Sequence, residues 1–249
     1  MIHQPETWEH VWKDRASQNG LIPRAGRLLA SHGDLQKLVM KILKRNCRIM
    51  QNTRILEVGC GSGPVAGRLK RLTPMVYGVD ISRAAAELTS ETGVSVAVTD
   101  ARELPFKDGS FDLVYSTGVV DLFDDASAAA ILREMVRVTC SGGRTVIITA
   151  WKGCRLHETI KNYLIRKGRW RYGPKRTFAS LEPFLQISGI RIREKSMGAF
   201  FQFRFVSYLF EEHKLARRMY HGVYLVLSIL LRPLNRLPGA ILVTMAEKE

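Results

Sequence analysis

The sequence predicts one α/β domain built as a three-layer sandwich around a mostly parallel sheet. Between residues 53 and 150, short continuous apolar runs alternate with amphipathic stretches of helical length. Strands that are apolar on both faces and separated by helices are typical of a parallel sheet covered on both sides. The composition, 46% hydrophobic and 24% charged over 249 residues, excludes long disorder and suits one domain with insertions.

The elements of this domain follow from changes in hydrophobic period. Residues 7–18 and 34–50 read as helices, the second because Leu35, Leu38, Val39, Ile42 and Leu43 recur every three or four residues. The predicted strands are 54–58, 75–79, 94–98, 111–115, 143–149, 190–195 and 240–246. Further helices are predicted at 64–72, 82–91 and 126–138.

We expect the single domain, 1–249, to have five parts. These are a helical N-terminal cap (1–52), a ligand-binding core (53–151), a basic insertion (152–177), an amphipathic insertion (199–238) and a last strand (239–249). The net charge of +15 is concentrated outside the core. Residues 152–176 hold nine basic residues and one acidic residue, whereas 55–151 hold nine and twelve. Such segregation indicates a docking face for an anionic partner.

Cysteine and histidine usage argues against several classes of site. The four cysteines form no C-x-x-C pair and, with the six histidines, show no ligand spacing, so neither a disulfide framework nor a metal site is expected. The chain begins without an apolar stretch, and no secretory signal is expected. We therefore expect a cytoplasmic protein.

A glycine-rich loop follows the first predicted core strand. Residues 55–69 read ILEVGCGSGPVAGRL, with glycines in a G-x-G-x-G spacing rather than the G-x-G-x-x-G of dinucleotide sites. Glycines allow the backbone to turn sharply and to approach a ligand. Glu57, two residues before the first glycine, suits a cationic ligand such as a sulfonium amino acid better than a pyrophosphate.

Four segments in order resemble the motifs of Rossmann-like, class I S-adenosylmethionine (SAM)-dependent methyltransferases. They are EVGCGSG (57–63), YGVDIS (77–82), DARELPFKDGSFDLVYS (100–116) and SGGRTVIIT (141–149). They are most similar to the ubiquinone/menaquinone-biosynthesis C-methyltransferase-like subfamily, over roughly residues 53–150. The resemblance implies a seven-stranded Rossmann-like sheet with a final antiparallel strand, here about 240–246.

The resemblance also implies SAM as cofactor and S-adenosylhomocysteine as product. Glu57 and the glycine loop would hold the amino-acid end, Asp80 the ribose hydroxyls, and Asp100 the adenine amino group. Asp80 could instead cap the helix at 82–91, but a cap does not explain the glycine loop. The implied cofactor-binding residues are Glu57, Gly59, Cys60, Gly61, Asp80, Ile81, Asp100, Ala101, Ser116 and Thr117.

Methyl transfer needs alignment of the acceptor and requires a general base only when the acceptor must lose a proton. Asp121 stands where many relatives carry His, and its alternative role is a helix cap. His157 falls in the insertion where relatives build a substrate lid. These two are the candidate catalytic residues. Trp8 and Trp12 share a helix face and either close over the cofactor or pack in the core.

Both insertions carry features of a docking surface. Residues 152–176 combine basic side chains with Trp170 and Tyr172, which can stack on bases or lie at a lipid headgroup boundary. Arg218 and Arg232 bracket 13 residues without charge, fewer than the ~20 that a spanning helix needs. A buried helix is the alternative, but the flanking arginines favour association with an anionic membrane surface.

We therefore predict a SAM-dependent methyltransferase that acts on a small or lipid-like acceptor, with peripheral membrane attachment. One alternative is an RNA methyltransferase whose basic insertions bind phosphate, which keeps nucleic acid open as a partner. The other is a SAM-binding protein without catalysis. The acceptor atom and the oligomeric state are left open.

Overall fold

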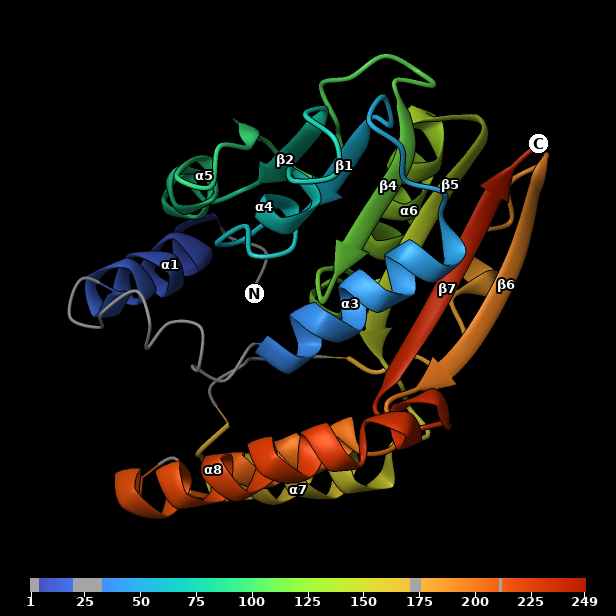
Figure 1. Cartoon of the computed structure of the whole chain (residues 1–249). Coiled ribbons are helices and arrows are strands. Elements are labelled where there is room, and N and C mark those ends of the chain that lie inside the picture. The colour runs from blue at the N-terminus through green and yellow to red at the C-terminus, as the bar shows by residue number, and fades with distance from the viewer. Residues whose placement is uncertain (1–4, 20–32, 171–175, 211) are drawn as a thin grey trace.

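The computed structural model describes residues 5–19, 33–170, 176–210 and 212–249. A seven-stranded sheet forms the middle of the molecule, with helices on both faces (Figure 1). The strand order is β3-β2-β1-β4-β5-β7-β6, and β7 alone runs against its neighbours in this sheet. The predicted sandwich and its antiparallel final strand are thus confirmed.

The strands are short near the glycine loop and long toward the C-terminus. Their bounds are β1 Ile55–Val58, β2 Val76–Asp80, β3 Ser95–Val98, β4 Phe111–Thr117, β5 Thr139–Ala150, β6 Ile190–Met197 and β7 Ile241–Lys248. All four residues of β1 are buried, as expected for a central parallel strand. β5 begins before the predicted 143, because Thr139 pairs with Phe111 across an irregularity in the register.

Two apolar clusters hold the helices on the sheet. On one face, Leu38, Val39, Ile42 and Leu43 of α3 (Gly33–Asn46) pack over β1, β4 and β5. On the other face, Ile131, Leu132 and Met135 of α6 (Asp125–Val138) do the same. The remaining core helices are α1 (Pro5–Asn19), α4 (Ala66–Leu69) and α5 (Arg83–Ser90), with η1 (Val120–Leu122) after β4.

The helix predicted at 34–50 ends earlier, at Asn46. The Asn46 side-chain amide donates to the Ile42 carbonyl at 2.8 Å and so satisfies one of the last free carbonyls of the helix. The Met50 N–H then donates to the Thr53 hydroxyl at 2.8 Å, which forms a turn leading into β1. Local side-chain hydrogen bonds of this kind compete with helix continuation.

A second layer of helices lies beyond the carboxyl ends of β5 and β6 (Figure 1). It contains α7 (Arg155–Arg166), η3 (Phe201–Phe210), α8 (Lys214–Leu230) and η4 (Arg232–Arg236), while η2 (Glu182–Phe184) packs on α6. η3 packs on both α7 and α8, so the two predicted insertions meet in this layer. Among the described residues, no helix combines the length and apolar character needed to cross a membrane.

Candidate functional site

Three neighbouring strands end side by side at the edge of the sheet that faces α1 and the second helical layer. β1, β2 and β4 end at Val58, Asp80 and Thr117, and their pairing places Val58 opposite both Val79 and Ser116. The predicted loop leaves β1 at this edge. In open α/β sheets ligands bind at the carboxyl ends of the strands, near the point where the strand order reverses. Here that point lies between β1 and β4.

Glu57 is a buried acid on β1, directly opposite Tyr115 on β4. Its Oε2 accepts a hydrogen bond from the Ala66 N–H at 3.2 Å. Burial raises the pKa of Glu57 to about 8, against the opposing effects of Tyr115 and the Ala66 N–H. A positively charged ligand at this place would stabilise the ionised carboxylate.

Asp80, the last residue of β2, holds the glycine loop. Its Oδ2 accepts from the Gly61 N–H at 2.9 Å, and its Oδ1 accepts from the Ser82 N–H at 3.0 Å. Burial raises the pKa of Asp80 despite these two hydrogen bonds, and the charge of Glu9 raises it further. Its oxygens keep lone pairs for hydroxyl donors of a ligand, since a carboxylate accepts about four hydrogen bonds.

The loop itself requires glycine where its backbone turns into the left-handed region. Gly59 has φ +73°, and a Cβ there would collide with Val119, which follows β4. The N–H groups of Gly59 and Cys60 both donate to the Val79 carbonyl, at 2.8 and 3.0 Å. The Cys60 side chain packs against Gly78 of β2 and so points toward the sheet. Cys60 therefore presents only its backbone on the other side of the loop.

Helix α1 packs against this loop through Trp12. A Cβ at Gly61 would lie 2.7 Å from the Trp12 ring, so the indole contacts the loop. Glu9 on the same helix accepts from the Ser82 hydroxyl at 2.7 Å and from the Ala84 N–H at 3.2 Å. Trp8, one turn earlier, is half-buried.

Asp100 follows β3 and is paired with a residue that the sequence analysis missed. Arg102 lies 2.6 Å from the Asp100 carboxylate and also donates to it through its backbone N–H at 2.8 Å. This pairing lowers the pKa of Asp100. Ala101 packs against the cluster beneath α6, and Ile81 is half-buried after β2.

Several buried hydroxyl groups at the same edge have no hydrogen-bond partner in the described chain. They belong to Ser116 and Thr117 on β4 and to Thr149 on β5. Buried hydroxyls are normally paired, so these mark a place where a ligand or water completes the site. Together with two buried acids and a close-packed glycine loop, they fit a cofactor that is cationic at one end and carries hydroxyl groups.

The comparisons with known proteins agree with this geometry. Residues 56–147 match a family described as a methyltransferase domain. Over this segment the chain is similar to SAM-dependent methyltransferases. Over 116 residues it is 34% identical to the ubiquinone/menaquinone biosynthesis C-methyltransferase UbiE of Geotalea uraniireducens, covering 42% of this chain and 48% of the relative. Over 160 residues it is 26% identical to the chloroplastic tocopherol O-methyltransferase of Arabidopsis thaliana, covering 57% and 45%.

A solved structure shares the fold over most of the chain. A SAM-dependent methyltransferase from Thermotoga maritima, described as a possible histamine N-methyltransferase, superposes with a TM-score of 0.61 at 20% identity, covering 90% of this chain and 95% of that one. The chain spans about half the length of the curated relatives above. The resemblance in sequence is therefore concentrated in the segment that contains the glycine loop and the two buried acids.

The two candidate catalytic residues lie in different parts of the molecule. Asp121 is fully buried in η1, beyond β4, where its backbone carbonyl accepts from the Arg176 N–H at 2.7 Å. Arg176 also donates to the Phe123 carbonyl and pairs with Asp125. Arg176 thus ties the end of the basic insertion to the loop after β4, a contact that the sequence analysis did not anticipate.

His157 is buried on α7 within a cluster of aromatic rings. Its ring centroid lies 4.1 Å from that of Phe205 and 6.2 Å from that of Trp170. Tyr208 and Phe201 extend the cluster along η3. Tyr172 lies outside the described residues. No group of His, Cys, Asp or Glu suited to a metal ion occurs in the part of the chain that the structure describes.

Proposed function

We propose that this protein transfers a methyl group from SAM to a small apolar acceptor, and that it does so at a membrane surface. The observation that carries the proposal is the pair of buried carboxylates, Glu57 and Asp80, flanking the glycine loop of a methyltransferase domain. When bound there, SAM supplies an electrophilic methyl group on a sulfonium sulfur.

The residues of this chain would bind, orient and exclude water. Glu57 would oppose the positive charge of the cofactor, and Asp80 would accept from its hydroxyl groups while it holds the Gly61 N–H. Trp12 on α1 would cover the loop. Asp100 and Ala101 would border the adenine beside Ile81, and Ser116 and Thr117 would face the reactive end.

The aromatic cluster around His157 supports an apolar acceptor. Rings from α7 and η3 line the layer next to the carboxyl edge, and aromatic side chains offer apolar surface with few polar groups. Two relatives are named for tocopherol and for ubiquinone/menaquinone biosynthesis, which are apolar compounds. We propose Asp121 and His157 as the groups that would take a proton from a hydroxyl or amine acceptor.

Labelled SAM tests the reaction. The protein is incubated with methyl-labelled SAM and a cell extract, and the products are partitioned into organic, nucleic-acid, protein and small-polar fractions. We expect label in the organic fraction, and none there with Asp80→Asn. Label in nucleic acid would contradict the proposed acceptor.

A second measurement separates failure of catalysis from a missing acceptor. The solved structure of a [4+2]-cyclase superposes with a TM-score of 0.56 at 17% identity. The fold alone is therefore not evidence of methyl transfer. SAM binding without transfer in extracts from several sources would contradict an enzymatic role. If transfer is found, loss of its dependence on pH in Asp121→Asn or His157→Gln identifies the base.

A further inference from the structure

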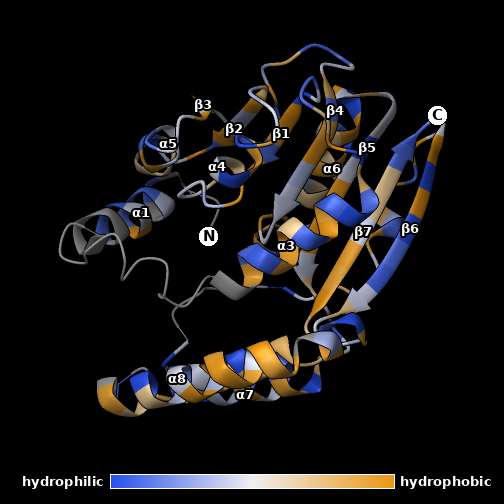
Figure 2. Ribbon diagram, viewed as in Figure 1, coloured by the Kyte–Doolittle hydropathy of each residue, from blue (hydrophilic) through white to orange (hydrophobic). Residues whose placement is uncertain are grey.

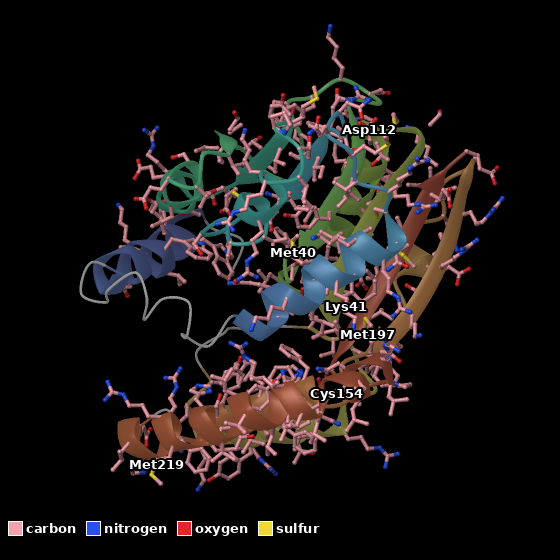
Figure 3. All side chains as sticks on the ribbon, viewed as in Figure 1. Met40, Lys41, Asp112, Cys154, Met197 and Met219 are labelled. Carbon is pink, nitrogen blue, oxygen red and sulfur yellow. The ribbon has the colours of Figure 1, made fainter. Side chains whose placement is uncertain are left out.

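Helix α8 carries its aliphatic side chains on the side that faces away from the protein. We call this set the α8 stripe: Leu215, Met219, Val223, Val226, Leu227, Ile229 and Leu230, all exposed. Most of them follow one another at intervals of three or four residues, so they lie on one helix face. Figure 2 shows the resulting concentration of hydrophobic colour on α8, and in Figure 3 Met219 projects away from the sheet.

The inner side of α8 is aromatic and partly polar. Tyr224 is buried and stacks on Phe200 with ring centroids 5.4 Å apart. The Tyr220 hydroxyl donates to the Phe203 carbonyl at 2.5 Å, and Tyr220 also contacts Phe210. These contacts fix the rotation of the helix about its axis. In water alone, an arrangement with hydroxyls inside and aliphatic groups outside is unfavourable.

The dimensions of α8 restrict what can cover the stripe. Its 17 residues extend about 25 Å, less than the ~30 Å of a hydrocarbon core, so the helix does not span a bilayer. A helix with one apolar face and basic residues beside it lies in the plane of the membrane interface. α8 contains no Asp or Glu, and Arg218 is exposed beside the stripe.

Basic residues continue past the far end of the helix. A small pocket between α3 and η4 is lined by Lys41, Arg45 and Arg236, together with Met197 at the end of β6. Figure 3 shows Lys41 and Met197 near one another above this end of α8. Positive charge therefore flanks the apolar stripe at both ends, which complements the phosphates of anionic lipids.

A second copy of this chain fits the stripe less well. Two copies would bring the same basic residues together, in a protein whose net charge is already +15. An anionic bilayer avoids this repulsion, because it accepts aliphatic side chains and offers negative charge to the basic residues.

We propose that the α8 stripe inserts into the headgroup–acyl boundary of an anionic bilayer, with Lys41, Arg45 and Arg236 at the level of the phosphates. This proposal deepens the proposed function, because it names the surface of the protein and the chemistry of the lipid. It rests on the proposed function only for the identity of the reaction that takes place at that surface. β5 and β6 both lead into the layer that contains α8, so the carboxyl edge of the sheet faces the same membrane.

Vesicle binding without SAM tests the proposal independently of catalysis. Flotation is measured with vesicles of phosphatidylcholine alone and of phosphatidylcholine mixed with phosphatidylglycerol. We expect the wild type to bind the mixed vesicles preferentially. The triple variant Met219→Gln, Val223→Gln, Leu230→Gln should bind them at least about tenfold more weakly, because three inserted aliphatic groups are lost. Gln is a good helix former, so α8 is retained in the variant.

Matched controls make the result decisive. Met50 is 50% exposed and Met219 66%, but Met50 lies before β1, away from the stripe, so Met50→Gln should bind like the wild type. Arg45→Gln with Arg236→Gln should reduce the preference for the mixed vesicles. Equal binding by the triple variant and the wild type would overturn the proposal, as would no vesicle binding by the wild type. A concentration-dependent dimer that the triple variant abolishes would assign the stripe to a second copy instead.

Discussion

Four acids of this protein show how the surroundings of a carboxyl group decide its charge. Burial raises the pKa of Glu57 and Asp80 at the ends of β1 and β2. The pKa values of Asp100 and Asp112 are lowered, because Arg102 and Arg54 pair with them. The acids that suit a cationic ligand are thus the two without an arginine beside them, which the residue type alone does not reveal.

Glu57→Gln tests the buried acid through stability. In the folded protein Glu57 keeps its proton up to about pH 8, whereas in the unfolded chain it loses it near its ordinary value of 4.5. Folded protein therefore binds more protons between these values, and the free energy of unfolding falls as pH rises from about 4.5 to 8. We expect the variant to be more stable than the wild type at pH 9, by a few kcal/mol at most. Denaturant unfolding at pH 5 and pH 9 measures this, and parallel pH profiles for the two proteins would contradict it.

Asp80→Asn tests the acceptor at the end of β2. An amide retains one acceptor oxygen but loses the charge and the second acceptor, so we expect SAM to bind at least about tenfold more weakly. Isothermal titration calorimetry measures the dissociation constant. The matched control is Asp112→Asn, which disrupts the pair with Arg54 (2.8 Å) at the opposite ends of the strands. An equal loss of affinity in both variants would mean that general destabilisation, not Asp80, is responsible.

At the scale of elements, the attachment of α1 links the cofactor loop to α5. Glu9 satisfies N–H and hydroxyl donors in the first turn of α5, where a negative charge also suits the helix dipole. Trp12 then rests on Gly61. Glu9 therefore positions α1 against α5, and Trp12 covers the glycine loop.

Glu9→Ala should release α1 from α5. We expect faster amide hydrogen exchange in residues 5–19 and weaker SAM binding, both measured on the same protein. Lys13→Ala is the control, because Lys13 pairs with Glu9 at 3.5 Å within α1 and this ion pair does not involve α5. Unchanged exchange in Glu9→Ala would show that α1 is held by other contacts.

Two glycines in the second helical layer differ only in backbone conformation. A Cβ at Gly222 in α8 or at Gly168 after α7 would meet nothing within 4 Å, but Gly168 has φ +66°. We expect Gly222→Ala to stabilise the protein by up to about 1 kcal/mol through helix propensity. Gly168→Ala should destabilise it by about 1 kcal/mol through left-handed strain. Thermal unfolding measures both, and shifts of the same sign would contradict the argument.

For the whole molecule, the distribution of charge matters more than its total. Exposed bases occur on α7 at Arg155 and Arg166 and just after it at Lys167, and β6 bears three others at the far edge of the sheet. α7 belongs to the layer that carries the α8 stripe. Exposed bases therefore lie both in the layer of the α8 stripe and far from it, and only the first group would face the proposed membrane.

Removal of three positive charges from either the α7 region or β6 tests which bases contact the proposed membrane. Arg155→Gln, Arg166→Gln, Lys167→Gln should weaken binding to mixed phosphatidylcholine–phosphatidylglycerol vesicles and reduce its salt dependence. Arg191→Gln, Arg193→Gln, Lys195→Gln on β6 should have a much smaller effect. Flotation at low and high salt provides the comparison, with RNA binding measured in parallel. Equal losses from both variants would indicate a uniformly basic surface.

The sequence by itself determined the sheet, the glycine loop and the two acids, because apolar period and backbone geometry are local properties of the chain. The seven predicted strands correspond to the seven strands of the sheet, and G-x-G-x-G after a buried strand is a loop whose conformation other residues rarely adopt. Only the tertiary structure decided three features: the pairing of Glu57 with Tyr115, the contact between Trp12 and Gly61, and the exposure of the aliphatic face of α8. These depend on which distant segments meet, and an apolar helix reads the same in sequence whether its aliphatic face turns toward a core or away from it.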